Sequence, residues 1–419
     1  MIMQTIRRAV TRTTAGAALL LGTAACGDQF LKVTNPNVID AATVDPVSGA
    51  ATLALSAQQN YTFSIGWLAT YVGWFTGEAN VSDTFPTRNE FGFRTITDLN
   101  GSLAGDVWNP MQQAAASAKA VLDLTLPNPT SNLNIARAAT FRGFAILQLA
   151  TDFCSATLSS GPELTTAQML DSAIFWFTRG VDVGRANASA DGVALANAAL
   201  VGRARARLQK GDNAGAGTDA TAVPNGFVFN LRYTDDLANR NRLSNRQWQF
   251  SFDRGSISVA RWYHSQNDPR VTFNPPGRTT ANPQDQVPEG FYQQTKFPGY
   301  GSPMRLASKL EAEYIAAEVG STDAQLAFIN AQRAANRLPA YSGPTTAAAV
   351  KTELYNQRAM EFFLEGKRLA DFRRSPANVA SITPSGQPYF KPGYGNVGTQ
   401  TCYPIPRSER DNNPNMKTN

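Results

Sequence analysis

The sequence predicts a mostly α-helical fold in which pairs of helices form a scaffold with a large loop-rich face. Alanine-rich segments with apolar residues three and four positions apart recur along the chain, which is the spacing of amphipathic helices. Short clusters of Pro, Asn, Ser and Gly separate these segments. The stretch 211–303 instead combines frequent Pro and Gly with many aromatic residues and weak helical periodicity, which predicts a long loop-rich insertion.

The composition indicates a globular protein and argues against several kinds of site. The chain has 419 residues, of which 42% are hydrophobic, so it can bury a large core. Its one histidine, His264, excludes multi-histidine metal sites and has no motif around it for a catalytic triad. Three of the 38 basic side chains lie in the first 25 residues, so the rest of the chain has 35 basic and 32 acidic side chains. This small, scattered excess predicts no nucleic-acid partner, and no pattern predicts a metal or a cofactor.

The N-terminus reads as an export signal. Residues 1–25 combine a basic start with the apolar run AGAALLLG and small residues before Cys26. The ending TAAC is similar to a bacterial lipobox, so we expect lipidation of Cys26 and anchoring through several acyl chains. An ordinary secretory signal with a chance cysteine is the alternative, and the export route stays open. Residues 26–47 are polar and suit an extended tether.

Helices are expected in series along the chain. The first covers Ser48–Thr62, and the aromatic-rich segment after it has no clean periodicity. Four more are expected at Trp108–Leu124, Asn134–Phe153, Thr166–Ala186 and Asp191–Lys210. Ala and Gly recur at packing positions in ARAATFRGFAILQLA and ANAALVGRARARLQKGD, as in tetratricopeptide-type repeats, where small residues let neighbouring helices approach closely. We therefore expect tetratricopeptide-like helix pairs.

The second half of the chain is expected to return to helices after the insertion. Within the insertion, NGFVFNLRY and RQWQFSF read as short strands. Helices are expected at Met304–Val319 and Ala324–Arg337. The tail GTQTCYPIPRSERDNNPN is rich in Pro and Asn and is expected to pack as coil.

The stretch Leu354–Arg374 has the densest local pattern and reads as one amphipathic helix with a charged edge. Ion pairs are expected at helical spacing along this edge, and they are Arg358–Glu361, Glu365–Arg368 and Lys367–Asp371. A catalytic pair of Glu361 and Glu365 is the alternative. It is disfavoured because nearby arginines would keep both carboxylates ionised, whereas acid–base catalysis needs their pKa values to differ.

Two cysteines remain if Cys26 is acylated. Cys154 and Cys402 then form an even pair in an oxidising envelope, where a disulfide is permitted. Two buried free thiols are the alternative.

Several pieces, taken in order, resemble the SusD/RagB family of outer-membrane nutrient-binding lipoproteins. They are the lipoprotein cysteine followed by FLKVTNPN, then DVWNPM, DPR, MRLASKLEAEYIAAE, FINAQRAANRL, LYNQRAMEFFLEGKRLADFRR and YPIPRSERDNNPN. The resemblance covers the chain from residue 26 to the end. It implies one SusD-like domain over residues 48–419, an α-α superhelix of tetratricopeptide-like pairs in which Trp108 is a structural tryptophan.

The resemblance also implies a function. Such a protein would be lipid-anchored in the outer membrane, exposed at the cell surface, and would capture a glycan for a SusC-like TonB-dependent transporter. Capture of a peptide or another nutrient is an alternative. An envelope glycan hydrolase is a less favoured alternative. The sequence has no pair of acidic residues away from other charges and no spacing typical of metal ligands. We therefore expect a binding protein and not an enzyme.

The ligand contacts are predicted from physical chemistry, because the family offers no motif for them. Sugar rings present apolar faces beside hydroxyl groups, so aromatic side chains flanked by polar ones suit them. Two stretches meet this description and supply the candidates Trp74, Asn80, Asp83, Arg88, Trp262, Tyr263, Tyr292 and Tyr300. Core packing is the alternative for each aromatic residue. Trp262 and Tyr263 are the favoured pair, because two adjacent large aromatic residues in a coil cannot easily both point inward.

Overall fold

Helices dominate the structure, a computed structural model that describes residues 46–276 and 290–416. The expected signal peptide, Cys26 and nearly all of the tether lie outside the described residues. The α-helices are α2 (Pro46–Phe75), α3 (Pro86–Gly92), α4 (Asn109–Leu122), α5 (Leu133–Asp152), α6 (Thr166–Asn187), α7 (Ala190–Lys210), α8 (Asn213–Thr221), α9 (Arg240–Leu243), α10 (Arg246–Trp248), α11 (Arg261–His264), α12 (Lys309–Glu318), α13 (Thr322–Ala335), α14 (Ala347–Glu361), α15 (Arg368–Arg374) and α16 (Arg407–Asn412). The mostly helical fold class is confirmed, and no helix within the described ranges is long and apolar enough to cross a membrane.

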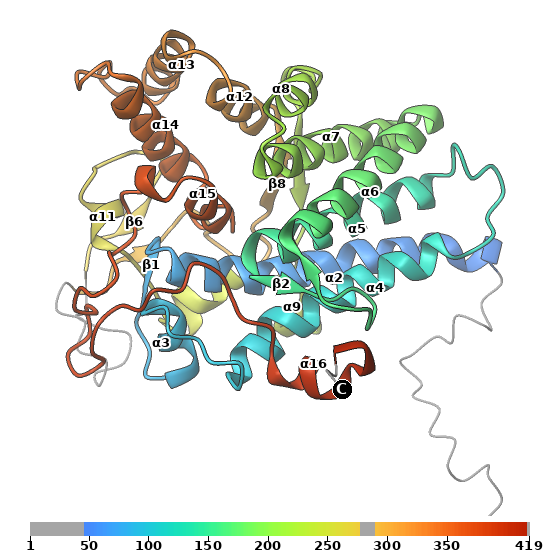
Figure 1. Ribbon diagram of the computed structural model, residues 1–419, viewed down its shortest axis with the longest axis horizontal. Coiled ribbons are helices and arrows are strands. Elements are labelled where there is room, and N and C mark those ends of the chain that lie inside the picture. Colours follow the sequence, from blue (N-terminus) through green and yellow to red (C-terminus); the bar gives the residue numbers. More distant parts are fainter. Residues whose placement is uncertain (1–45, 277–289, 417–419) are drawn as a thin grey trace, which may run out of the picture. The chain divides into compact units, whose positions relative to one another are not determined.

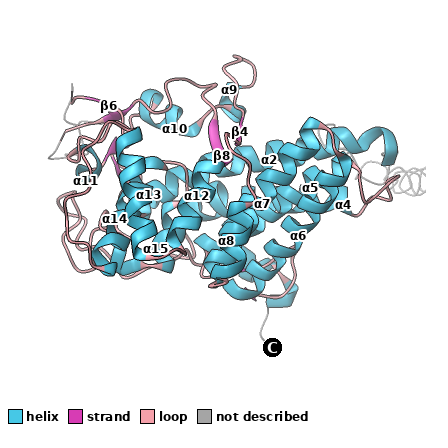
Figure 2. Ribbon diagram, turned by 90° about the horizontal axis from the view of Figure 1, so that it is seen from above, coloured by secondary structure: helices cyan, strands magenta, loops and turns pink. Residues whose placement is uncertain are grey.

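The strands are short and pair only two by two (Figure 2). They are β1 (Ala79–Val81) with β5 (Ile257–Val259), β2 (Ser155–Ala156) with β3 (Leu164–Thr165), β4 (Val228–Leu231) with β8 (Met304–Ser308), and β6 (Phe273–Asn274) with β7 (Gln293–Gln294). All four pairs are antiparallel. Turns of π-helix at Leu103–Trp108 and Gln249–Asp253 and of 3-10 helix at Pro376–Asn378 and Pro414–Met416 complete the elements.

Helices consecutive in the sequence pack side by side. Each of α4, α5, α6 and α7 contacts the next helix, α8 contacts α12, and α2 lies along α4 and α5 (Figure 1). Side-chain caps mark where several helices begin: Thr165 and Gln168 form a capping box at α6, and Ser189 caps α7. Gly211 ends α7 with a left-handed φ of 89°, where glycine is favoured. The predicted helices at α5, α6, α7 and α13 are confirmed to within a few residues.

Small residues allow α5, α6 and α7 to meet closely around Phe177, which is fully buried. A Cβ on Gly202 would lie 2.3 Å from the Phe177 ring, and one on Gly143 would lie 2.7 Å from it. The two glycines therefore make the space that this ring fills, as the predicted small-residue packing requires.

Gly202→Ala is expected to destabilise the protein by about 1–3 kcal/mol, because overpacking at Phe177 outweighs the better helix propensity of alanine. Urea unfolding measures this. Gly217→Ala on α8 is the matched control, since its nearest neighbour would be a Val319 methyl at 3.3 Å. Equal losses in the two variants would contradict the packing argument.

The first described helix is twice as long as predicted. It was expected to end at Thr62 but continues to Phe75 as α2. Its second half is buried nearly all round, so apolar residues occupy every face and no amphipathic period appears.

The insertion also departs from the prediction in part. NGFVFNLRY does contain strand β4, but RQWQFSF forms α10 and a π-helical turn. Asn245 caps α10, because its side-chain oxygen accepts hydrogen bonds from the backbone N–H groups of Gln247 and Trp248. This cap favours the start of a helix over a strand. Met304–Ser308 was expected to open a helix, but it pairs with β4 and the helix begins at Lys309.

The stretch Leu354–Arg374 is two helices and not one. α14 ends at Glu361 and α15 begins at Arg368, and the turn between them holds Leu364 and Gly366 at φ values of 57° and 71°. A Cβ on Gly366 would lie 3.2 Å from the Ala69 Cα, so this turn packs tightly against α2.

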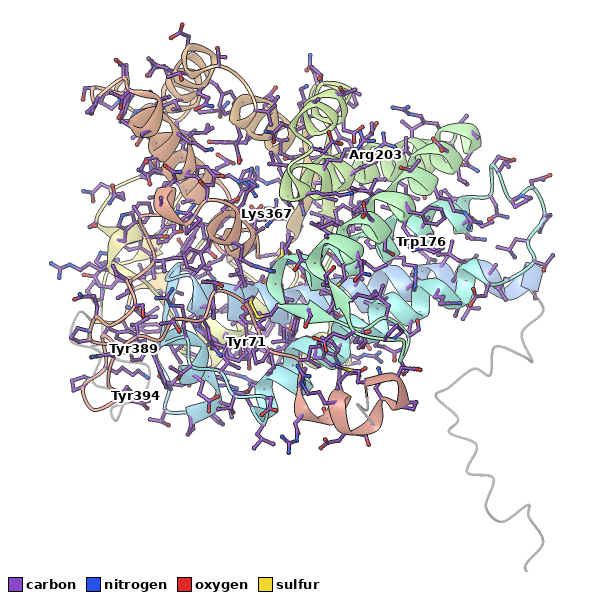
Figure 3. The ribbon with its side chains drawn as sticks, viewed as in Figure 1. Tyr71, Trp176, Arg203, Lys367, Tyr389 and Tyr394 are labelled. Carbon is purple, nitrogen blue, oxygen red and sulfur yellow. A yellow bond between two sulfur atoms is a disulfide. The ribbon has the colours of Figure 1, made fainter. Side chains whose placement is uncertain are left out.

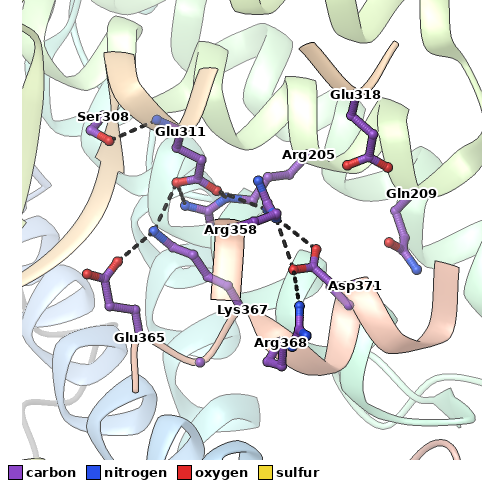
Figure 4. Close-up of polar contacts among 12 residues, drawn as sticks. Arg205, Gln209, Ser308, Glu311, Glu318, Arg358, Glu365, Lys367, Arg368 and Asp371 are labelled. Atoms are coloured by element: carbon purple, nitrogen blue, oxygen red, sulfur yellow. Dashed lines mark hydrogen bonds and ion pairs between the residues drawn. The ribbon is translucent and has the colours of Figure 1, made fainter. Parts of the chain in front are cut away.

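The three expected ion pairs within this stretch do not form, and the same residues pair instead with other partners, several of them distant in the sequence. Arg358 binds Asp371 at 2.9 Å and Lys367 binds Glu311 at 3.0 Å (Figure 4). Glu365 binds Lys296 and Arg305, each at 2.9 Å. Burial alone would raise the pKa of Glu311, but Arg205 and Lys367 bring it down to about 2. The charges thus join α7, β8, α12, α14 and α15, which supports the structural interpretation of this edge.

Cys154 and Cys402 form a disulfide, as one of the two alternatives predicted. The bridge joins the end of α5 to the C-terminal tail. Backbone hydrogen bonds continue the contact, because Cys154 N–H donates to the Tyr403 carbonyl and Tyr403 N–H donates to the Asp152 carbonyl. The tail is therefore fixed to the scaffold at this point.

Replacing both Cys154 and Cys402 by serine is expected to lower the free energy of unfolding by about 2–5 kcal/mol, because the loop that the bridge closes is long. Urea unfolding without reductant checks this, and reductant added to the wild type provides the control. The expectation is wrong if the double variant unfolds at the wild-type urea concentration.

Candidate ligand-binding site

A cavity of about 170 Å³ lies where the end of α2, strand β1, the start of α11 and the C-terminal loop come together. Its lining is Trp74, Gly77, Ala79, Asn80, Gly92, Ala260, Arg261, Trp262, Ser381, Thr383, Pro388, Tyr389 and Phe390. Arg261, Thr383 and Pro388 are exposed, so the cavity reaches the surface. We call it the aromatic cavity.

The end of α2 supplies the buried wall. Trp74 is 1% exposed and packs edge-on against Tyr71 and Phe250, with ring centroids 5.0 and 5.8 Å away. Its indole Nε1 is buried, and no described residue accepts a hydrogen bond from it. A buried donor without a partner costs free energy, so Trp74 is held in this wall by the packing of its ring.

Strand β1 and helix α11 supply the opposite side. Asn80 pairs with Ser258 in the β1–β5 ladder, and its side-chain amide makes no hydrogen bond within the described ranges. Ala260 N–H donates to the Glu78 carbonyl, which sets the start of α11 beside β1. Trp262 is half-buried in this first turn and can present its ring to the cavity.

The C-terminal loop closes the cavity with Tyr389 and Phe390. Three long-range hydrogen bonds hold this loop: Arg94 to the Thr383 carbonyl at 2.7 Å, Gly398 N–H to the Phe93 carbonyl at 2.7 Å, and Lys391 to the Asp83 carbonyl. The rings of Tyr389 and Tyr394 lie 5.9 Å apart in the same loop (Figure 3). Gly77 permits a close approach, since a Cβ there would lie 2.8 Å from the Ser381 carbonyl oxygen.

Three of the eight predicted contact residues, Trp74, Asn80 and Trp262, line the aromatic cavity. Asp83 and Arg88 are buried and pair with each other at 2.6 Å. They support the cavity and do not line it, because the Asp83 backbone carbonyl accepts a hydrogen bond from Lys391 of the C-terminal loop.

The other three predicted residues lie elsewhere. Tyr263 is fully buried, with its ring 5.0 Å from Phe363, so the favoured pair divides into one core residue and one cavity residue. The pair sits in a helical turn and not in coil. The Tyr292 ring stacks on His264 at 3.8 Å. The Tyr300 hydroxyl donates to Asp253, and its ring lies 5.4 Å from Trp248.

Solved structures of low sequence identity share this architecture. A SusD-like carbohydrate binding protein from Bacteroides vulgatus is 14% identical, covers 88% of this chain and 97% of its own, and has a TM-score of 0.67. A SusD-like carbohydrate binding protein from Bacteroides fragilis is 14% identical, with coverage of 88% and 99% and a TM-score of 0.63. A SusD superfamily protein from Bacteroides thetaiotaomicron is also 14% identical, with coverage of 88% and 98% and a TM-score of 0.63.

The chain has a SusD-like fold. No protein-family model and no curated protein matches the sequence. The likeness is therefore one of architecture, and it covers nearly the full length of the solved SusD-like chains.

Within this SusD-like fold, Glu78 lies between two residues of the cavity wall and is fully buried. Its carboxylate accepts a hydrogen bond from the Leu364 N–H at 2.8 Å, which ties the end of α2 to the turn between α14 and α15. Burial raises the pKa of Glu78 to about 7, although Leu364, Arg368 and Lys296 oppose the shift. Near neutral pH this carboxylate is therefore partly protonated.

Glu78→Gln is expected to remove a pH dependence of stability. Because the folded pKa of about 7 exceeds the unfolded value of 4.5, the native state binds more protons between these pH values, and stability falls as pH rises through them. The variant carries no charge at any pH, so relative to the wild type it should gain up to about 3 kcal/mol between pH 4 and pH 8. Urea unfolding of both proteins across this range tests this, and a constant difference would contradict it.

The sequence analysis missed Tyr389 and Phe390. They lie in PYFKPGYG, which combines turn residues with three aromatic rings and falls between the helical stretch Leu354–Arg374 and the tail, where no element was predicted. That composition is the signal of an ordered aromatic loop. Its position against Trp74 depends on contacts with residues 83–94 and 77, which local sequence does not reveal.

Proposed function

We propose that this protein binds a glycan in the aromatic cavity. The observation that carries the proposal is the meeting of Trp74, Trp262, Tyr389 and Phe390 from three distant segments around one surface cavity. Aromatic faces suit the apolar faces of sugar rings, and the Asn80 amide and the Ser381 and Thr383 groups can orient hydroxyl groups. The solved SusD-like carbohydrate binding proteins with the same fold support this ligand class.

The size of the cavity favours recognition of one ring. At about 170 Å³ it is smaller than the roughly 300–1,000 Å³ of pockets that enclose whole drug-sized ligands. A terminal or protruding sugar would occupy it while the rest of the oligosaccharide runs over the exposed rim at Arg261 and Pro388.

Binding without catalysis fits the lining. None of the described residues that line the aromatic cavity has a carboxylate, and the carboxylate of Glu78, behind the wall, accepts a hydrogen bond from the Leu364 N–H. Glycoside hydrolysis generally needs two carboxyl groups on either side of the scissile bond. We therefore favour a binder over a hydrolase.

The wider role that we propose is nutrient uptake. The lipobox-like TAAC suggests an anchor at Cys26 in the outer membrane, with the domain at the cell surface. From there the protein would deliver its glycan to a SusC-like TonB-dependent transporter. Co-purification of such a transporter from membranes, lost on Cys26→Ala, would support this placement, and a soluble protein without lipid would contradict it.

Trp262→Ala is expected to weaken glycan binding by more than about tenfold, because a truncated aromatic anchor loses both area and shape. A glycan array selects the oligosaccharide, and calorimetry with that oligosaccharide measures the affinity. Tyr389→Ala should show the same loss.

Trp176→Ala is the matched control. Trp176 is also half-buried but lies on α6, away from Tyr389 and outside the cavity lining (Figure 3). Unchanged affinity in both cavity variants would remove the aromatic cavity as the site, and turnover of the oligosaccharide by the purified protein would contradict the binder.

A further inference from the structure

A second, internal cavity lies between α5, α7, α14 and α15, apart from the aromatic cavity. Its volume is about 30 Å³, enough for one or two water-sized occupants. It is lined by Leu147, Gln148, Thr151, Arg205, Leu208, Gln209, Arg358, Gly366, Lys367, Ala370 and Arg374, none of which is exposed.

Every charged residue in this lining is basic. Arg205, Arg358, Lys367 and Arg374 contribute to the wall, while the carboxylates that pair with them do not. Those carboxylates are Glu311, Glu318, Glu365 and Asp371, and they approach the same cations from other sides (Figure 4). The cavity is thus a point where positive groups converge without a negative one.

One N–H group of the Arg358 guanidinium lacks a hydrogen-bond partner among the described residues. Its Nε lies 2.9 and 3.0 Å from the two Asp371 oxygens, and its Nη2 lies 4.0 Å from Glu311. Its Nη1 is buried and has no hydrogen-bond partner among the described residues, although the residue is only 5% exposed. A buried guanidinium N–H without an acceptor is costly, so an occupant that accepts a hydrogen bond is expected here.

The surrounding network also has an excess of positive charge. The ion pairs that connect to the cavity residues contain eight basic and six acidic side chains within the described ranges. The basic ones are Arg205, Arg270, Lys296, Arg305, Arg358, Lys367, Arg368 and Arg374, and the acidic ones are Asp268, Glu311, Glu318, Glu361, Glu365 and Asp371. Most of these groups are buried, where an unbalanced charge is costly. Glu78 also lies near Arg368 and Lys296, but burial raises its pKa to about 7, so it offsets this excess only in part.

We propose that the internal cavity binds one chloride ion. Water could accept from Arg358 Nη1 but would leave the excess charge in place, whereas chloride supplies both an acceptor and a negative charge. The small volume of about 30 Å³ favours a monatomic ion over sulfate or phosphate. The apolar contacts from Leu147, Leu208 and Ala370 suit a large, weakly hydrated ion. The ion would link α14 and α15 to α5 and α7.

Crystals of the wild-type protein grown in sodium bromide test the proposal directly. Bromide replaces chloride and scatters anomalously at its absorption edge. An anomalous peak is expected in the cavity within hydrogen-bond distance of Arg358 Nη1. A cavity that holds only water at molar bromide would overturn the proposal.

Thermal unfolding gives a second measurement. Above the dissociation constant, each tenfold rise in chloride should raise Tm by about 2 °C, compared with gluconate at the same ionic strength. Equal Tm values in the two salts would overturn the proposal.

Arg358→Met should abolish the chloride-specific rise. Arg203→Met is the matched control, because Arg203 is likewise an ion-paired arginine on a scaffold helix, but it lies on α7 and pairs with Asp219 away from the cavity (Figure 3). It should lose stability yet keep the chloride dependence. Chloride dependence that survives in Arg358→Met would contradict the site, and the bromide crystal of the wild type decides the question even where that variant does not fold.

Discussion

The fold depends on matching buried carboxylates with basic groups from other elements. Glu311 and Glu365 have side chains that are almost wholly buried, and their partners come from α7, strand β8, the loop before it and the turn before α15. An isolated buried carboxylate would cost several kcal/mol, so these elements cannot shift relative to one another without exposing or orphaning a charge. Such pairs add less to stability than to specificity, since apolar residues could fill the same space. Here they define where α12, α14 and α15 sit against the repeat helices.

That constraint extends to the ligand site through α2. The turn that carries Glu365 and Lys367 packs on Ala69, and its Leu364 N–H binds Glu78 at the end of α2. Trp74 lies one turn before Glu78, so the charge network and the buried wall of the aromatic cavity share a support. The C-terminal loop that closes the cavity is held independently, by hydrogen bonds from Arg94 and Lys391 to backbone carbonyls. A rigid wall and a rigid loop lower the ordering cost of binding, which favours affinity for a small ligand.

Local sequence patterns predicted those elements whose structure is determined by local interactions. The helices α5, α6, α7 and α13 follow from periodicity and capping residues, and Trp74, Asn80 and Trp262 follow from aromatic residues beside polar ones. The predictions were wrong for segments whose structure is determined by burial against distant parts of the chain. α2 is apolar on every side and shows no period. The charges of Leu354–Arg374 look like a helical ladder, but several of them bind partners that are distant in the chain, such as Glu311 for Arg358 and Arg305 for Glu365. Asp83 and Arg88 resemble ligand contacts, yet they satisfy each other.

The bond between Cys154 and Cys402 has a consequence for how the molecule withstands proteases. It encloses everything from the end of α5 to the tail, including the exposed loops of the insertion and the loop that carries Tyr389. A single cut anywhere between these two cysteines would leave one covalent molecule, with both fragments still held against the scaffold. Nicking concentrates at exposed loop tips, so the protein can be clipped beside the aromatic cavity and still keep the segments that line it.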